Sequence, residues 1–185
     1  MSIGLIPLSA KPYHSAHHHI VQLAARENSK VILYVSTSDR IKEGEFPIYG
    51  KSMLEVWKRE IENILPKNVE IVYGGSPVRK VYEFIGDACK YGIHGDYVVY
   101  SDIEDTKNNY SMSYRQKYMQ PLHEMGNIAF AAEVNPDMYT RGSGAPNCSG
   151  TLMRKYLQEN NKKDFFDGLP NGIDKNWIFK FLRNN

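Results

Sequence analysis

The sequence predicts an α/β fold with a parallel β-sheet, for two reasons. First, five short runs rich in Val, Ile and Tyr have the length and residue types of strands, and several are almost continuously apolar, as strands buried on both faces are. Second, amphipathic segments separate these runs, and such alternation predicts βαβ units. The expected strands are Ile3–Leu8, Val31–Val35, Val69–Tyr73, Tyr97–Tyr100 and Ile128–Val134.

The expected helices repeat apolar residues at steps of three or four. This spacing predicts Ser52–Leu65, which Pro66 ends, and Val78–Lys90, while Asn108–Met125 is more polar. The segment Asn135–Cys148 has the Pro and Gly content of a loop. Further helices are expected at His17–Glu27, Thr151–Leu157 and Asp174–Leu182.

The length of 185 residues is typical of one domain, with a core over 3–157 and a helical tail over 158–185. The net charge of +2 gives no broad basic footprint, so we expect no nucleic-acid partner. No apolar run is long enough to span a bilayer, and the N-terminus does not resemble a signal peptide. Cys89 and Cys148 lack the spacing of a metal site. This cysteine usage fits a reducing compartment, and we expect a cytoplasmic protein.

The turn after the first strand, from Pro12 to His17, is the first candidate functional motif. Open α/β sheets bind ligands outside the carboxyl ends of their strands, and N–H groups at the start of a helix attract anions. His14 and His17 are three residues apart, so they share one side of the helix start. Each could donate a hydrogen bond to a phosphate oxygen.

A metal site in the run His17-His18-His19 is an alternative interpretation. Zinc needs three or four convergent ligands, whereas adjacent helical residues point about 100° apart. No second Cys/His cluster completes such a site in the sequence. We therefore expect His18 and His19 to be packing or surface residues and expect no side chain to ligate a metal, although a metal-dependent hydrolase remains an alternative.

The second motif is Ser149-Gly150-Thr151 with Arg154, at the predicted start of a helix. Ser149 is a good N-cap residue, and Gly150 permits a close approach of the backbone to a ligand. Arg154 lies one turn into the helix and could reach back to phosphate oxygens held there. The alternative is a capped helix with a surface arginine.

Together the two motifs resemble the nucleotidyltransferase superfamily with the histidine-x-glycine-histidine signature, also called cytidylyltransferase-like. Relatives include phosphopantetheine and nicotinamide-mononucleotide adenylyltransferases. The order of elements is similar from about Ile3 to Leu157, but Ala16 stands where glycine is usual. Leu8 and Ala10 also replace the usual glycine and aromatic residue. The resemblance implies a Rossmann-like open five-stranded sheet of order 3-2-1-4-5, with helices on both faces.

The resemblance also implies roles for individual residues. His14, His17 and Arg154 would be catalytic and contact the phosphates. A solvated charged loop around Arg40 and Lys42, and a simple turn at Gly75, are the alternatives for the acceptor side. The implied nucleotide-binding residues are Ser9, Ala10, Lys11, Ser101, Asp102, Ser149, Gly150 and Thr151, and the implied acceptor-binding residues are Arg40, Lys42, Gly75 and Ser76.

The expected reaction is transfer of AMP or CMP from a nucleoside triphosphate to a small phosphorylated acceptor, with release of pyrophosphate. Mg²⁺ would accompany the triphosphate. The acidic run Asp102, Glu104 and Asp105 is either a magnesium site or an ordinary acidic loop. Many relatives are oligomers, so a homo-oligomer is compatible with the resemblance. A nucleotide-binding module without catalysis is the main alternative function.

Overall fold

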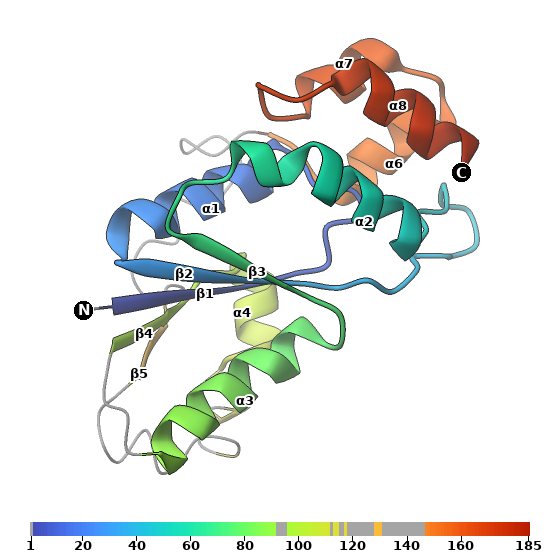
Figure 1. Ribbon diagram of the computed structural model, residues 1–185. Helices are drawn as coiled ribbons and strands as arrows, with labels where there is room; N and C mark the ends of the chain where they lie inside the picture. The colour runs from blue at the N-terminus through green and yellow to red at the C-terminus, as the bar shows by residue number, and fades with distance from the viewer. Residues whose placement is uncertain (1, 92–95, 112, 115–116, 118–127, 131–146) are drawn as a thin grey trace.

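The computed structural model describes residues 2–91, 96–111, 113–114, 117, 128–130 and 147–185. Strands and helices alternate along the first part of the described chain, and a group of helices follows (Figure 1). The strands are β1 (Ser2–Leu8), β2 (Lys30–Val35), β3 (Val69–Tyr73), β4 (Asp96–Val99) and β5 (Ile128–Phe130). The helices are α1 (Ser15–Glu27), α2 (Gly50–Arg59), the 3₁₀ helix η1 (Ile61–Ile64), α3 (Pro77–Lys90), α4 (Ile103–Asn109), α6 (Gly150–Gln158), α7 (Lys162–Asp167) and α8 (Lys175–Asn184).

The sheet is open and parallel, and its strands lie in the order β3-β2-β1-β4-β5. The expectation of an open parallel sheet with helices is confirmed. β1 is central and pairs with β2 through Leu8 opposite Val35, whereas its pairing with β4 ends at Leu5 opposite Val99. The short strand β5 pairs with β4 over three positions, and the predicted continuation at 131–134 lies outside the described residues.

The sheet separates two apolar cores, which explains why its central strands are apolar on both faces. Helices α1 and α2 cover one face, and α3 and α4 lie on the other (Figure 1). Alternate residues of β1 point to opposite sides: Ile6 joins the core under α1 and α2, and Leu5 joins the core under α3. Helices α6, α7 and α8 continue the first core through buried residues such as Met153 and Phe165.

Three expected elements differ from the structure. The helix expected over Ser52–Leu65 is interrupted at Glu60, where α2 ends and the tighter turn of η1 follows. The Glu60 carboxylate accepts a hydrogen bond from the N–H of Asp174, a tertiary contact that apolar periodicity does not encode. The acidic segment after β4 is helical: Asp102 Oδ1 accepts from the N–H of Asp105 at the start of α4.

Helix α4 ends at Asn109, so the helix expected to begin at Asn108 does not begin there. Most of the remaining expected range, 112–125, lies outside the described residues, as does most of the expected loop at 135–148. In the described part of the chain, no helix has the length and hydropathy that crossing a bilayer requires.

Candidate functional site

The turn between β1 and α1 brings His14 and His17 together. His14 is the N-cap residue of α1 and has extended backbone angles, while His17 lies in the first turn of the helix. Their imidazole rings stack, with 3.8 Å between centroids and 22° between planes. Ala10, which begins this turn, has a φ of 51°, in the left-handed region that costs a non-glycine residue energy. The turn therefore holds both imidazoles in one fixed arrangement.

The hydrogen bonding of His17 defines its protonation state. The backbone N–H of His14 donates to Nδ1 of His17 at 3.3 Å. A ring nitrogen that accepts a hydrogen bond carries no proton, so the neutral imidazole has its proton on Nε2. Burial lowers the pKa of His17 to about 4. At neutral pH, His17 therefore offers an uncharged Nε2–H donor.

The neighbouring histidines are placed differently. His18 Nδ1 is 2.9 Å from the hydroxyl oxygen of Tyr13, within hydrogen-bonding distance. Burial lowers the pKa of His18. His18 and His19 both line a cavity of about 510 Å³ that is also bordered by α7 and α8 residues such as Asp167 and Lys175. In the described part of the chain, no group of three or more His, Cys, Asp or Glu side chains converges as metal ligands would.

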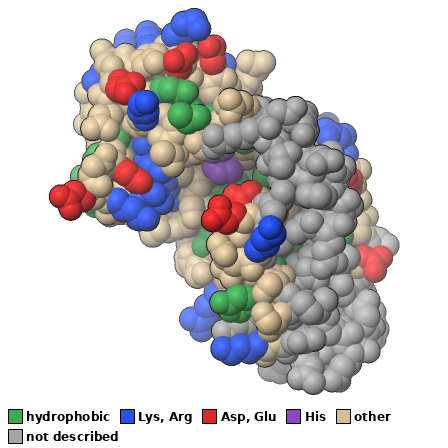
Figure 2. All heavy atoms as spheres, turned by 180° about the vertical axis from the view of Figure 1, so that it is seen from behind, with side chains coloured by type: hydrophobic (Ala, Val, Ile, Leu, Met, Phe, Trp, Pro, Cys, Tyr) green, Lys and Arg blue, Asp and Glu red, His purple; other side chains and the backbone are tan. Residues whose placement is uncertain are grey.

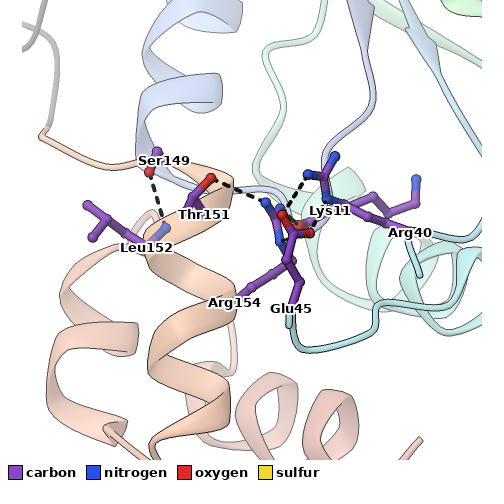
Figure 3. Close-up of polar contacts among 7 residues, drawn as sticks. All are labelled: Lys11, Arg40, Glu45, Ser149, Thr151, Leu152 and Arg154. Carbon is purple, nitrogen blue, oxygen red and sulfur yellow. Dashed lines mark hydrogen bonds and ion pairs between the residues drawn. The ribbon is translucent and has the colours of Figure 1, made fainter. Parts of the chain in front are cut away.

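Ser149 caps α6, as expected from the sequence. Its side chain accepts a hydrogen bond from the N–H of Leu152 at 3.2 Å (Figure 3). Gly150 follows at the first helical position, where a Cβ atom would lie 2.8 Å from Nη1 of Arg154. A Cβ atom at this position would therefore displace the end of the Arg154 side chain, which passes directly beside the backbone.

Arg154 joins the two motifs. Its guanidinium reaches back along α6, where Nη2 donates to Thr151 Oγ1 at 3.3 Å. Nη1 donates to the main-chain oxygen of Lys11 at 2.7 Å (Figure 3). The Arg154 side chain is only 7% exposed. The start of α6 and the turn after β1 therefore meet through a buried cation.

Glu45 connects Arg154 to Arg40. Its Oε2 atom is 3.3 Å from Nε of Arg154 and 2.9 Å from Nε of Arg40. Arg40 Nη2 also donates to Oε1 at 3.1 Å, which completes a two-point contact (Figure 3). The hydrogen bond from Arg40 is the main cause of a lowered Glu45 pKa. Burial is the main cause of a lowered Arg154 pKa, and Glu45 opposes it.

Arg40 is therefore placed at the site, whereas the other expected cation of this loop is not. Lys42 is exposed, and its main-chain oxygen accepts from the N–H of Glu45. Sequence reasoning missed Glu45 because it is one of several charges in a polar loop. No local pattern distinguishes it from Glu43, and only the folded chain brings it to Arg154.

Lys11 is buried, with 5% of its surface exposed. Its ammonium donates to the main-chain oxygens of Ser9 and Ser36, both at 2.8 Å. Burial lowers its pKa to about 8, and the charge of Asp39 partly opposes this change. The Lys11 side chain thus contacts the main chain just beyond β1 and β2, and no sequence pattern indicated the contact with Ser36.

Two of the other predicted nucleotide contacts, Ser9 and Ser101, lie at a small cavity at the carboxyl ends of β1 and β4. Its volume is about 120 Å³, and Ser9, Ser101 and Asp105 line it. Burial and the charge of Asp102 raise the pKa of Asp105 to about 6. Asp102 itself is exposed and caps α4.

The turn between β3 and α3 lies beside a larger cavity of about 620 Å³, lined by Ser76, Arg79 and Tyr82 among others. This cavity shares Val78 with the smaller one. Gly75 has a φ of 68°, so the backbone conformation of the turn is enough to account for a glycine at this position. Figure 2 shows histidine atoms in a hollow on the face opposite to Figure 1, with charged side chains around it.

One expected anion donor is already engaged. The N–H of Ser15, the first residue of α1, donates to the main-chain oxygen of Gly168 at 2.8 Å. Gly168 follows α7, so the C-terminal helices contact the start of α1 directly. Anion binding at this turn would therefore depend on the imidazole donors more than on the first N–H of the helix.

No protein-family model matches the sequence, and no curated protein matches it. Among solved structures, the fold is similar to that of Thermotoga maritima TmcAL bound with alpha-thio ATP, at 14% sequence identity and a TM-score of 0.48. The match covers 99% of this chain and 55% of TmcAL, so the chain spans about half the length of that protein.

Proposed function

We propose that the protein is a nucleotidyltransferase that transfers AMP or CMP from a nucleoside triphosphate to a small phosphorylated acceptor and releases pyrophosphate. The observation that carries this proposal is the hydrogen bond from Arg154 to the Lys11 oxygen. It brings a buried guanidinium from the start of α6 to the turn that holds His14 and His17. A cation and neutral N–H donors at the carboxyl edge of a parallel sheet suit a triphosphate.

The proposed chemistry is direct in-line displacement. An oxygen of the acceptor attacks the α-phosphorus, the bond from that phosphorus to the bridging oxygen breaks, and pyrophosphate leaves with the electron pair. His17 Nε2–H and His14 donate to phosphate oxygens as negative charge develops on them, and Arg154 with Thr151 binds the leaving pyrophosphate. Catalysis then depends on position and electrostatics, and no covalent intermediate with a protein residue is required.

Magnesium would arrive with the triphosphate in this proposal. Mg²⁺ usually takes one or two protein carboxylates and completes its shell with phosphate oxygens and water. Asp105 lines the cavity at the end of β1 and fits that limited role. The ion would neutralise phosphate charge, while the residues named above position the reacting groups.

Nucleotide binding is the first test of the proposal. Thermal unfolding would be followed with ATP, CTP, GTP and UTP, each with MgCl₂. A ligand at about 100 times its Kd stabilises the native state by about 2.7 kcal/mol. We expect ATP or CTP to raise the Tm, and no rise with any nucleotide would contradict the proposal.

Turnover is the second test. Pyrophosphate release would be measured from the stabilising nucleotide with a panel of phosphomonoesters, together with the variants His17→Ala and Arg154→Ala. Loss of an electrostatic contact to the transition state lowers kcat by about 100-fold or more. His19→Ala is the matched control, because it alters a neighbouring histidine outside the proposed contacts. A stable nucleotide complex that never yields pyrophosphate would instead indicate a binding module.

A further inference from the structure

The Lys11 ammonium lies at the carboxyl ends of two central strands. It donates to the oxygens of Ser9, just after β1, and Ser36, just after β2. An ammonium has three hydrogens, and within the described residues these bonds use two of them. One donor therefore remains for a partner that the described part of the chain does not supply.

The charge of Lys11 is also incompletely neutralised. Burial of a cation is unfavourable unless an anion accompanies it. Over the described ranges, no carboxylate lies within ion-pair distance of this ammonium. Asp39 acts only at longer range, and its Oδ1 accepts the N–H of Gly50 at 2.7 Å. An added anion beside Nζ would therefore gain both a hydrogen bond and a charge interaction.

The two ends of Lys11 serve different parts of the site. Its main-chain oxygen accepts from Arg154, whereas its ammonium reaches the ends of β1 and β2. In an in-line displacement, the attacking and leaving groups lie on opposite sides of the phosphorus. If Arg154 binds the leaving pyrophosphate, a cation anchored at the ends of β1 and β2 is available to the attacking group.

The cations expected to bind the acceptor are less suited to it. Glu45 holds Arg40 through two hydrogen bonds, at 2.9 and 3.1 Å. Lys42 is exposed to solvent. Lys11 is buried and rigidly anchored, so an anion that reaches it loses less energy to side-chain ordering and to screening by water.

We propose that the Lys11 ammonium binds an oxyanion of the acceptor, a phosphate or a carboxylate, and thereby selects anionic acceptors over neutral ones. This inference depends on the proposed nucleotidyl transfer and assigns the acceptor contact within it. In this proposal Lys11 binds the acceptor, whereas the sequence resemblance implied that it binds the nucleotide.

Sulfate is a suitable probe because it remains a dianion across the working pH range. The protein would be saturated with α,β-methylene-ATP and MgCl₂, which occupy the nucleotide site without reaction. Sulfate would then be titrated while ¹H–¹⁵N spectra record the amide signals of Ser9 and Ser36. We expect a saturable shift of both signals in the wild-type protein.

Lys11→Met should weaken this sulfate binding at least tenfold and leave the Kd of α,β-methylene-ATP within about threefold. Lys42→Gln is the matched control and should bind sulfate as the wild type does. If Lys11→Met does not fold, Lys11→Gln removes the charge but keeps a hydrogen-bond donor. Lys11→Arg should retain most of the sulfate affinity because it keeps the cation.

Three results would overturn the inference: no saturable sulfate shift in the wild type, unchanged sulfate affinity in Lys11→Met, or an equal loss of nucleotide affinity in that variant. The last result would make Lys11 a nucleotide contact. If the wild type binds no nucleotide at all, the proposed function fails separately. The same sulfate titration without nucleotide then still decides whether Lys11 holds an oxyanion.

Discussion

The guanidinium of Arg154 donates a 2.7 Å hydrogen bond to the main-chain oxygen of Lys11, which lies 143 residues earlier in the chain. Both groups are buried. The bond fixes the turn after β1 against the start of α6, and all the proposed phosphate contacts lie near one of these two segments. The geometry of the Arg154 side chain can be tested separately from its positive charge.

Arg154→Lys keeps the charge but loses the fork that reaches Lys11 and Thr151 together. A buried carbonyl without its donor costs about 1–3 kcal/mol, so we expect a lower free energy of unfolding in denaturant titrations. Nucleotide affinity should fall about tenfold. Arg183→Lys is the control, because Arg183 also donates to a main-chain oxygen, that of Leu157, but outside the site. An unchanged nucleotide Kd in Arg154→Lys would contradict the assignment.

Gly150→Ala tests the close approach at the start of α6. The added methyl group would lie 2.8 Å from Arg154 Nη1, so the guanidinium must move away from the Lys11 oxygen. We expect weaker nucleotide binding by calorimetry, with a change in stability of less than about 1 kcal/mol because alanine favours the helix. Gly86→Ala in α3 meets no atom within 4 Å and serves as the control. Full nucleotide affinity in Gly150→Ala would show that the position of Arg154 is unimportant.

Glu45→Gln should strengthen nucleotide binding. The Glu45 carboxylate lies between Arg154 and Arg40, where it competes with any phosphate for the same donors. Removal of its charge should lower the Kd of the triphosphate roughly tenfold, an effect that decreases as salt is added. Glu70→Gln, which alters a surface ion pair with Lys30, should have no such effect. Weaker binding in Glu45→Gln would instead mean that Glu45 orients the arginines for the nucleotide.

His17 should remain neutral throughout the physiological pH range. Its folded-state pKa is about 4, below the value of 6.5 for an unperturbed histidine, so the unfolded state binds more protons between these values. The contribution of His17 to stability is therefore complete above pH 6.5 and is lost as the pH falls toward 4. Long-range ¹H–¹⁵N spectra should show an Nε2–H tautomer at pH 7 and a midpoint near 4. A midpoint near 6.5 would contradict the burial and tautomer described above.

Local patterns were sufficient to predict the alternation of strands and helices, because β1–β3 and α3 owe their residue types to burial within a layered fold. Ser149 was also predictable, since an N-cap depends only on adjacent residues. The interruption of the second helix falls at Glu60, whose carboxylate accepts from the N–H of Asp174, and local periodicity does not encode this tertiary contact. The same holds for Glu45, whose partners lie on other segments.

The functional motifs were predicted in sequence order, but their connections were not. Arg154 was expected to reach back to phosphate oxygens at the start of the helix, and in the structure it donates to Thr151 there. Lys11 can donate to the Ser36 oxygen because β1 pairs with β2. A sequence pattern does not specify which group the end of a long side chain will contact. Long-range contacts of this kind require the three-dimensional arrangement of the strands.

The hydrogen bond from Ser15 to Gly168 has a consequence for the order in which the protein folds. It joins the start of α1 to a residue far along the sequence, and contacts of high sequence separation are slow to form because a long stretch of chain must be closed into a loop. During synthesis, β1 and β2 can pair long before Gly168 leaves the ribosome. The histidine turn therefore acquires its final geometry only after α7 and Gly168 have been made.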